Sequence, residues 1–222
     1  MRGLLLFLFL AIYKISSAQL LIDVGYTPSY FTLDGMDAIS SDFNTSNPWL
    51  TDGLNEFHFL HGVHMRIKHQ IDEISPWIEV NYQLNSNKYE GTRPGETTLS
   101  KGQVRSSLSS YLGGLEWEKD FFGIGGGVGY QRANFRLKED DGPMNIDDKF
   151  LELSGVFATF YLSFLPAIDE DNISNLVIQP FVNIPFQASD FQAAQEYFQL
   201  DDLDGERFWQ IGIRLILSNG QR

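Results

Sequence analysis

The chain has 222 residues, a length that suits one domain, and it contains no cysteine, so disulfide bonds do not hold it together. Its formal net charge is −13 and no basic stripe is present, which argues against a nucleic-acid partner. The 20 Gly, 18 Phe, 9 Tyr and 4 Trp favour strands over helices. A mean hydropathy of −0.18 is compatible with membrane insertion, because a membrane barrel distributes its apolar residues in alternation.

The N-terminal segment has the features of a secretory signal peptide. Arg2 provides a basic start, residues 4–13 form an apolar run, and small residues lead up to Ala18. The apolar run is too short to cross a bilayer as a helix. We therefore expect residues 1–18 to be a cleaved signal peptide and residues 19–222 to be the mature domain. A retained N-terminal anchor helix is the alternative.

Eight stretches of the mature chain alternate apolar and polar residues with the period of two that an extended strand requires. In chain order they are residues 20–33, 55–68, 77–84, a strand ending in 111–118, then 121–137, 150–164, 176–186 and 207–218. The last is the clearest, with Trp209 and Ile211 on one face and Gln210 and Arg214 on the other. In the second, alternation turns Phe57 toward the apolar outer face.

Two of these strands depart from simple alternation. Pro180 and Pro185 interrupt the seventh strand, because proline removes a hydrogen bond from the ladder. In the sixth strand Val156 and the even-numbered residues after it face lipid, whereas Leu151 and Leu153 fit the opposite phase. We therefore expect a β-bulge in the upper part of the sixth strand, or an extension above the membrane.

The connections between the strands alternate in length. Those after the odd-numbered strands are mostly long and polar or acidic: residues 34–53, 85–102, 138–149 and 188–206. Those after the second, fourth and sixth strands are shorter: residues 70–75, 119–120 and 166–175. The first short turn predicts His64 beside Glu79 and Arg66 beside Trp77. The second, a tight turn at residues 119–120, predicts Glu116 opposite Gly123.

This pattern resembles the small eight-stranded outer-membrane barrels, the OmpA-barrel and OmpX-like class, over essentially residues 19–222. The resemblance implies an all-β fold, an eight-stranded antiparallel up-and-down transmembrane β-barrel, with both termini in the periplasm and long loops outside. It also implies contact with outer-membrane lipid and lipopolysaccharide, and with other outer-membrane proteins. The chain departs from many such barrels by continuing past Leu217 without a final aromatic residue.

The polar faces of the strands predict a charged interior. The inward residues are Asp23, Glu56, His58, His64, Arg66, Lys68, Glu79, Glu116 and Arg214. Because an isolated buried charge is costly, these groups are expected to pair with one another. An eight-stranded barrel is only wide enough to be filled by its own side chains, and four glycines of one parity at 123–129 leave room for large ones. We expect a plugged interior with no open pore.

Sequence motifs for a specific chemistry are weak. His58, His61 and His64 do not share one face of a strand, and residues 201–206 do not fit the register of an EF-hand loop. The glycines at 123–129 lack the Lys-Ser/Thr of a phosphate-binding loop and precede no helical pattern. His64 with Glu79 could serve as a base and its orienting group, but no serine is clearly placed beside them.

We therefore assign no catalytic, metal-binding or cofactor-binding residue and expect no cofactor. The favoured function is a non-catalytic outer-membrane barrel that acts through acidic extracellular loops as a structural or interaction protein. One form of this function is an accessory subunit of an outer-membrane secretion or assembly complex. The alternative is a lipid-modifying barrel enzyme, a hydrolase or an acyltransferase. A soluble lipocalin-like carrier is a third possibility, and it would require the apolar faces to point inward.

Overall fold

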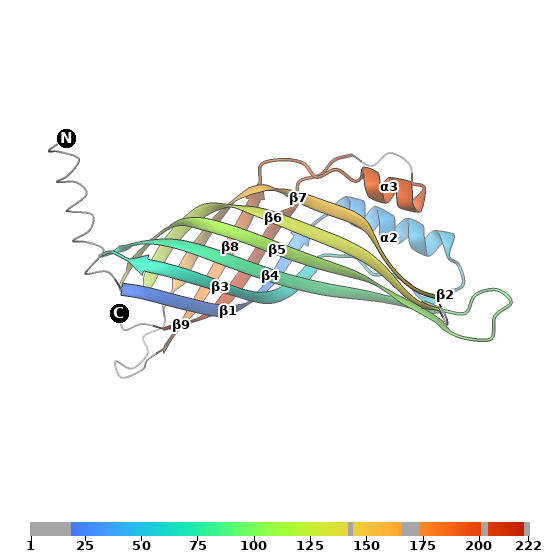
Figure 1. Cartoon of the computed structure of the whole chain (residues 1–222), viewed down its shortest axis with the longest axis horizontal. Coiled ribbons are helices and arrows are strands. Elements are labelled where there is room, and N and C mark those ends of the chain that lie inside the picture. Colours follow the sequence, from blue (N-terminus) through green and yellow to red (C-terminus); the bar gives the residue numbers. More distant parts are fainter. Residues whose placement is uncertain (1–18, 142–143, 166–173, 201–203, 220–222) are drawn as a thin grey trace.

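The computed structural model describes residues 19–141, 144–165, 174–200 and 204–219 (Figure 1). Its strands are β1 (Gln19–Thr32), β2 (Leu50–Asp52), β3 (Phe59–Gln70), β4 (Ile74–Gly91), β5 (Ser100–Lys119), β6 (Phe122–Asp141), β7 (Met144–Phe164), β8 (Ser174–Pro185) and β9 (Trp209–Asn219). Its helices are α2 (Asp34–Ser46) and α3 (Gln192–Phe198). The expected signal peptide, most of the turn at 166–175 and part of the acidic segment 201–206 lie outside the described residues.

Eight strands close into a ring, as the alternation predicts. The strand order is β4-β3-β1-β9-β8-β7-β6-β5, and β5 pairs with β4 to complete the circle. Each pairing is antiparallel, and the first and last strands of the ring join along a register that includes Ile22 opposite Asn219. The short strand β2 pairs with β4 outside the ring. Closure leaves the barrel without an open sheet edge, a condition for crossing a membrane with strands.

The outward faces of the ring form an apolar belt. Its exposed side chains include Val24, Val63, Met65, Ile78, Val80, Leu115, Ile124, Val128, Val156, Phe160, Ile213 and Leu215. Exposed aromatic residues lie toward the two ends of this belt: Tyr30, Phe59, Tyr82, Tyr111, Tyr130 and Trp209 at one, and Trp117, Phe121 and Phe164 at the other. On β6 the belt extends from Phe122 to Tyr130, close to the roughly 9–11 residues that a tilted strand needs to cross a bilayer.

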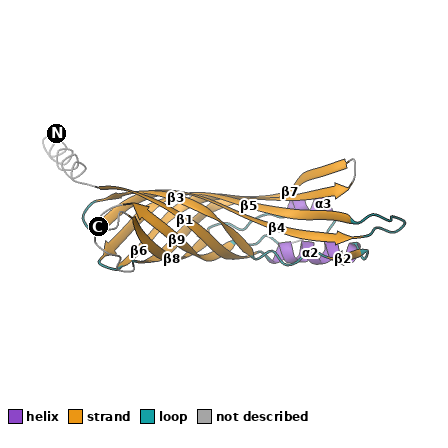
Figure 2. Cartoon of the chain, turned by 90° about the horizontal axis from the view of Figure 1, so that it is seen from below, coloured by secondary structure: helices purple, strands orange, loops and turns teal. Residues whose placement is uncertain are grey.

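Four strands continue past the belt and form a wall on one side of the molecule (Figures 1 and 2). The connections at 85–102 and 138–149 were expected to be loops, but β4, β5, β6 and β7 extend into both of them. The pairing of β6 with β7 runs up to Asp141 opposite Met144, with a register shift next to Arg136. This shift is a β-bulge at Phe150, since Phe135 faces Leu151 while Arg136 faces Lys149. It does not lie between Leu153 and Val156, where the phase of the apolar residues predicted it and where the pairing is regular.

Helices α2 and α3 lie beside the wall and form a cap over that end of the barrel (Figures 1 and 2). The prediction of polar loops at 34–53 and 188–206 was therefore wrong in part. Helix α2 forms because Met36, Ile39 and Phe43 recur at helical spacing and bury one face among otherwise polar residues. None of the described helices is long and apolar enough to cross a membrane.

The cap and the wall enclose an apolar core. Its buried members include Phe31, Leu33, Met36, Ile39, Leu54, Phe57, Leu60, Tyr89, Val104, Leu108, Phe135, Leu137, Phe150, Leu151, Leu153, Phe191 and Phe208. The predicted outward position of Phe57 was wrong, because β3 begins only at Phe59 and the preceding segment folds under the cap. Leu151 and Leu153 share the inward parity of β7, and they seemed out of phase because this part of the interior is apolar.

Candidate functional site

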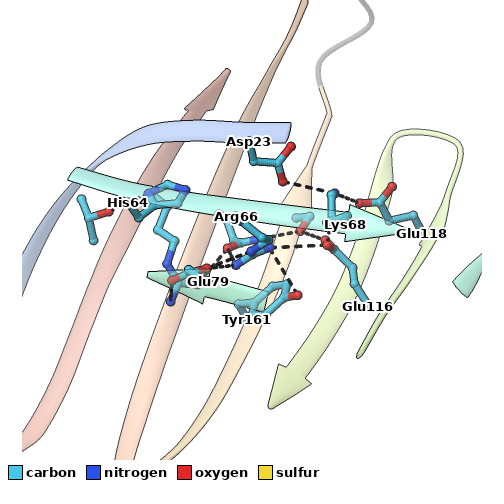
Figure 3. Close-up of polar contacts among 12 residues, drawn as sticks. Asp23, His64, Arg66, Lys68, Glu79, Glu116, Glu118 and Tyr161 are labelled. Carbon is cyan, nitrogen blue, oxygen red and sulfur yellow. Dashed lines mark hydrogen bonds and ion pairs between the residues drawn. The ribbon is translucent and has the colours of Figure 1, made fainter. Parts of the chain in front are cut away.

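The candidate site is the lumen of the ring, where charged side chains from several strands converge (Figure 3). Arg66 on β3 lies at its centre and is fully buried. Its Nε donates to Glu79 Oε2 at 2.8 Å, and its two terminal nitrogens donate to Gln179 Oε1 at 2.9 Å and Tyr161 Oη at 3.4 Å. Glu116 Oε2 lies 3.5 Å from the same guanidinium. Arg66 thus joins its own strand, β3, to four others, β4, β5, β7 and β8.

A second cation, Lys68, is two residues further along the same inward face. Its Nζ lies 2.6 Å from Glu118 Oε1, 3.3 Å from Glu116 Oε2 and 3.5 Å from Asp23 Oδ2. All four side chains are buried or nearly so. The ammonium therefore neutralises carboxylates from β1 and β5, which are not neighbours in the ring.

Arg214 on β9 completes the network. Its guanidinium lies 3.1 Å from Glu79 Oε1 and donates to Gln179 Oε1 at 2.8 Å. Glu79 is therefore held between two arginines, while Gln179 accepts from both and donates to Ser163. The network contains three cations (Arg66, Lys68, Arg214) and four carboxylates (Asp23, Glu79, Glu116, Glu118), so its charges nearly balance. Such balance is what makes buried charges tolerable.

Aromatic rings pack against the central arginine of this network. The Arg66 guanidinium carbon is 4.6 Å from the centroid of the Trp77 ring and 4.8 Å from that of Tyr161, a cation–π arrangement on two sides. The rings fit because the facing positions on β6 are glycines. A Cβ at Gly125 would collide with the Tyr161 ring, and one at Gly127 would lie 2.9 Å from Trp77 Cη2. The inward glycines predicted at 123–129 therefore make room for large side chains.

A layer of neutral polar groups separates the charges from the apolar core. Gln83 donates to the Thr27 carbonyl at 2.9 Å and to Ser29 Oγ at 2.8 Å. Gln210 donates to Ser29 Oγ at 2.8 Å and accepts from Asn183 at 2.7 Å. These side chains come from β1, β4, β8 and β9, so the layer holds the seam of the ring together from inside.

His64 does not lie in a catalytic arrangement. Its Nδ1 is 2.9 Å from Thr27 Oγ1, and its Nε2 has no hydrogen-bond partner among the described residues. The ring is only 2% exposed, so a substrate in the membrane or in solution does not reach it. The described residues also contain no group of three or more His, Asp or Glu side chains that could hold a metal ion.

Most of the predicted inward charges are confirmed as buried in the lumen: Asp23, His64, Arg66, Lys68, Glu79, Glu116 and Arg214. Two are not. Glu56 is exposed, and His58 lies at the rim of the cap, where its Nε2 is 3.2 Å from Asp37 Oδ2 and 3.3 Å from Glu56 Oε2. Both precede the start of β3, so strand alternation does not apply to them.

The predicted neighbours across the two tight turns were wrong by two residues. Arg66 faces Glu79 instead of Trp77, and His64 faces Asn81. The reason is the position of the turn, since Ile71 pairs with Ile74. The two-residue turn is therefore 72–73, one residue later than the predicted pairing requires, and Asp72 adopts a φ of 56°. The second hairpin shows the same error. Lys119 pairs with Phe122 and Asp120 has a φ of 53°, so Glu116 lies opposite Gly125. In each case the two-residue turn lies one residue later than predicted and begins at an aspartate, a residue that tolerates the left-handed conformation.

Three members of the network were missed from sequence: Glu118, Tyr161 and Gln179. Each has the inward parity of its strand, so alternation alone could have found them. Tyr161 is an aromatic residue in a strand whose lipid face is also aromatic, which hides its inward direction. Gln179 lies next to Pro180, which interrupts the pattern of the predicted seventh strand.

The direction of the side chains decides the class of protein. A closed ring that turns apolar residues outward and paired charges inward is suited to lipid and not to water. The chain has the fold of a membrane-spanning β-barrel of the outer-membrane type. A soluble carrier of the lipocalin kind would have the reverse arrangement, with apolar side chains around an internal cavity.

Comparisons with known proteins give only remote structural likenesses. No family model matches the sequence, and no curated protein matches it. Among solved structures, Ail of Yersinia pestis, determined with the heparin analogue sucrose octasulfate, is 10% identical, with 91% of this chain and 97% of Ail covered and a TM-score of 0.48. Neisserial surface protein A is 10% identical over 91% and 97%, with a TM-score of 0.35. The translocator domain of the autotransporter NalP from Neisseria meningitidis is 9% identical over 95% and 93%, with a TM-score of 0.40.

Proposed function

We propose that the protein is a non-catalytic outer-membrane barrel with a plugged polar lumen, which acts on other molecules through its cap and wall. In this proposal residues 1–18 are the signal peptide, and both termini of the mature chain 19–222 lie in the periplasm. The observation that supports a plugged lumen is the burial of the network around Arg66, whose charges are neutralised by one another. Charged side chains that line an open channel would instead be solvated by water.

A conductance measurement tests the plugged lumen. The barrel reconstituted in a planar bilayer should give no large, steady conductance, because side chains fill the interior from Lys68 to Gln83. Tyr161→Ala, which removes the ring that fills the space against Gly125, serves as a sensitivity control that opens part of the lumen. Steady conductance of the unmodified barrel would contradict the proposal.

The cap offers an acidic surface for partners. The exposed carboxylates of the cap and its flanking segments are Asp34, Asp42, Asp190, Glu196 and Asp204. Asp34, Asp42 and Glu196 lie on the two helices that pack on the apolar core, so much of this surface is presented on folded elements. Such a surface fits partners with complementary basic regions, and this role includes that of an accessory subunit in a secretion or assembly complex.

Crosslinking and affinity purification from native membranes test this role. A partner that binds the cap should be lost when Asp42 and Glu196 are changed to lysine. It should be retained when Glu73, at the opposite end of the barrel, is changed in the same way. Equal recovery from the two variants would contradict a role for the cap.

A lipid-modifying enzyme is the alternative. His64 contacts Thr27 and is buried, so no observation in the lumen favours this activity. Mass spectrometry of lipid A and phospholipids from cells with and without the gene separates the two functions. An unchanged lipid profile would exclude a lipid-modifying activity.

A further inference from the structure

A cluster of cations lies on the outward face of the wall, around Gln103 on β5. Lys88 on β4 and Lys138 on β6 are directly opposite Gln103, one on each side of it. Arg105 is two residues further along β5 and therefore on the same face. The Gln103 amide, oriented to satisfy its neighbours, accepts from the Arg105 guanidinium at 2.9 Å. Lys88, Arg105 and Lys138 thus form one cationic cluster with a neutral side chain at its centre.

The acids beside the cationic cluster pair with other cations. Glu90 pairs with Lys101 at 3.4 Å, and Asp147, although directly opposite Lys138, pairs with Arg136 at 2.9 Å. The three cations of the cluster form no ion pair with any carboxylate that the structure describes. The outward face of the wall therefore presents uncompensated positive charge at this place.

The segments that build the cap carry the opposite charge. Residues 34–57 contain five Asp or Glu and no Lys or Arg, whereas residues 186–208 contain six Asp or Glu and one Arg. Eleven acids and one base give these two segments a charge of −10, out of −13 for the whole chain. The negative charge of the protein is thus concentrated in the part of the chain that covers the inner side of the wall.

The two charged faces point in opposite directions. Helices α2 and α3 lie on one side of the wall (Figure 1), and the cationic cluster has the outward parity of the other side. On α2, Asp34 and Asp42 are exposed on the side of the helix opposite its buried apolar residues. Glu196 is exposed on α3. These three carboxylates define the acidic face of the cap, and a molecule with such opposed faces is complementary to a shifted copy of itself.

The two faces also lie at the same height along the barrel. Phe43 of α2 packs edge-on against Tyr89 of β4, with ring centroids 4.9 Å apart. Asp42 adjoins this contact on the cap side, and Lys88 adjoins it on the wall side. Copies that stand side by side in one membrane, in the same orientation, therefore bring the acidic face of one to the level of the cationic cluster of the next.

We propose that the cationic cluster of one barrel binds the acidic face of the cap on a second copy of this chain in the same membrane. The inference rests on the proposed function, which places the cap and the wall of every copy outside the membrane. The contact joins two different patches, so each copy keeps one face of each kind free, and further copies add to form a row or a ring. Because exposed ion pairs are individually weak and screened by salt, the association is reversible.

The test measures energy transfer between labelled copies of the mature barrel in vesicles of phosphatidylcholine, a lipid without net charge. The chain has no cysteine, so Gln19→Cys provides one exposed site for a donor or acceptor dye, at the end of the barrel opposite the cap (Figure 1). Unmodified copies should show more transfer than random encounter produces at low salt. Transfer should decrease as salt is added, because the screening length falls from about 10 Å at 0.1 M to about 3 Å at 1 M.

Two charge-reversed variants separate the two faces. Lys88→Glu/Arg105→Glu alters the cationic cluster, and Asp42→Lys/Glu196→Lys alters the acidic face. Each variant alone should associate about tenfold or more weakly than the unmodified barrel, because attractions across the contact become repulsions. A mixture of the two variants should recover the association. In the mixture the altered wall of the first is complementary to the altered cap of the second, and their unaltered faces are complementary as well.

A control substitution and three outcomes decide the proposal. Lys119→Glu reverses an exposed charge at the opposite end of the barrel and should associate like the unmodified protein. Equal transfer by the unmodified barrel and the two double variants overturns the proposal, and so does a mixture that does not recover. Loss of transfer in the wall variant alone, with the cap variant unaffected, assigns the cationic cluster to another acidic molecule and also overturns it.

A heat-dependent gel shift, the difference in migration between folded and heated forms, keeps this proposal separate from the proposed function. The double variants change exposed side chains, so each should show the same shift as the unmodified protein. A normal shift with unaltered energy transfer contradicts the contact between copies alone. The absence of a shift in the unmodified protein contradicts the membrane barrel itself.

Discussion

The lumen and the cap core are two interiors of one barrel, built on opposite principles. On the inward face of β7, Tyr161 and Ser163 take part in the charge network, whereas Leu151 and Leu153 pack in the apolar core. The outward face changes in the reverse sense, from apolar at Phe160 to charged at Glu152. Parity stays the same along the strand while the character of each face inverts.

This inversion follows the solvent outside. Where the strands of the ring face lipid, inward polar groups distinguish the two faces of each strand and so specify its register. Beyond the membrane, the outward face of the wall meets water. There the strands have the arrangement of a soluble protein, with apolar residues inside. The level at which β6 changes from Tyr130 to Arg132 thus marks the edge of the hydrocarbon.

The largest expected effect on stability comes from a substitution that breaks the lumen network. Arg66→Met removes the cation at its centre and leaves Glu79 and Glu116 less compensated, which should lower the free energy of unfolding by about 3–5 kcal/mol. Urea unfolding in detergent measures it. Arg132→Met, which breaks an exposed ion pair with Glu152, should change the free energy of unfolding by about 1 kcal/mol or less. Equal effects of the two would mean that the lumen charges contribute no more than surface charges.

The next effect concerns the cap core. Met36→Ala leaves a cavity beneath α2 and should destabilise the cap by about 2–3 kcal/mol, the lower part of the range for such truncations. Because the ring does not depend on α2 for closure, hydrogen exchange should accelerate in the cap and remain slow in the strands. Ala38→Gly on the exposed side of α2 should cost at most about 1 kcal/mol. Loss of the heat-dependent gel shift in Met36→Ala would show that the two interiors are coupled.

A smaller effect tests how tightly the lumen is filled. Gly125→Ala forces a methyl group against the Tyr161 ring and should cost about 1–3 kcal/mol through overpacking. Gly155→Ala is the matched control, since a Cβ there meets no atom within 4 Å. Thermal unfolding of the two variants in the same detergent compares them. A neutral result at Gly125 would indicate that Tyr161 has room to move.

The smallest effect is a pH dependence confined to the cap. Partial burial raises the pKa of the Asp37 carboxyl above its usual 3.8, while the nearby His58 opposes the shift. The folded cap therefore binds this proton more tightly than the unfolded chain does. The stability that results is fully present below pH 3.8 and is lost as the pH rises through the folded-state pKa.

Asp37→Asn should remove this dependence, because an amide does not titrate and can still accept from the Phe57 amide. Hydrogen exchange of α2 across the acidic range measures it. Asp42→Asn, at an exposed position of the same helix, should leave the pH profile unchanged. An identical profile for Asp37→Asn and the unmodified protein would contradict a role for Asp37.

Much of the ring was predictable because two-residue alternation is strong wherever one face meets lipid. It located the eight strands and seven of the inward charges. It did not give the register of two hairpins, because alternation does not record where a turn begins. Each turn begins one residue later than predicted, at an aspartate with positive φ. It also failed beyond the membrane. The polar composition of residues 34–53 concealed the helical spacing of Met36, Ile39 and Phe43, and the inversion of faces made Leu151 look out of phase.

The seam between β1 and β9 has a consequence for biogenesis. It joins residues as distant in sequence as Ile22 and Asn219, so the cylinder closes only once the final strand has been synthesised and delivered. Until then both lateral edges need another protein or a folding catalyst to cover their free amides and carbonyls. Such long-range pairing forms slowly, and the nascent polypeptide is exposed to aggregation in transit across the periplasm.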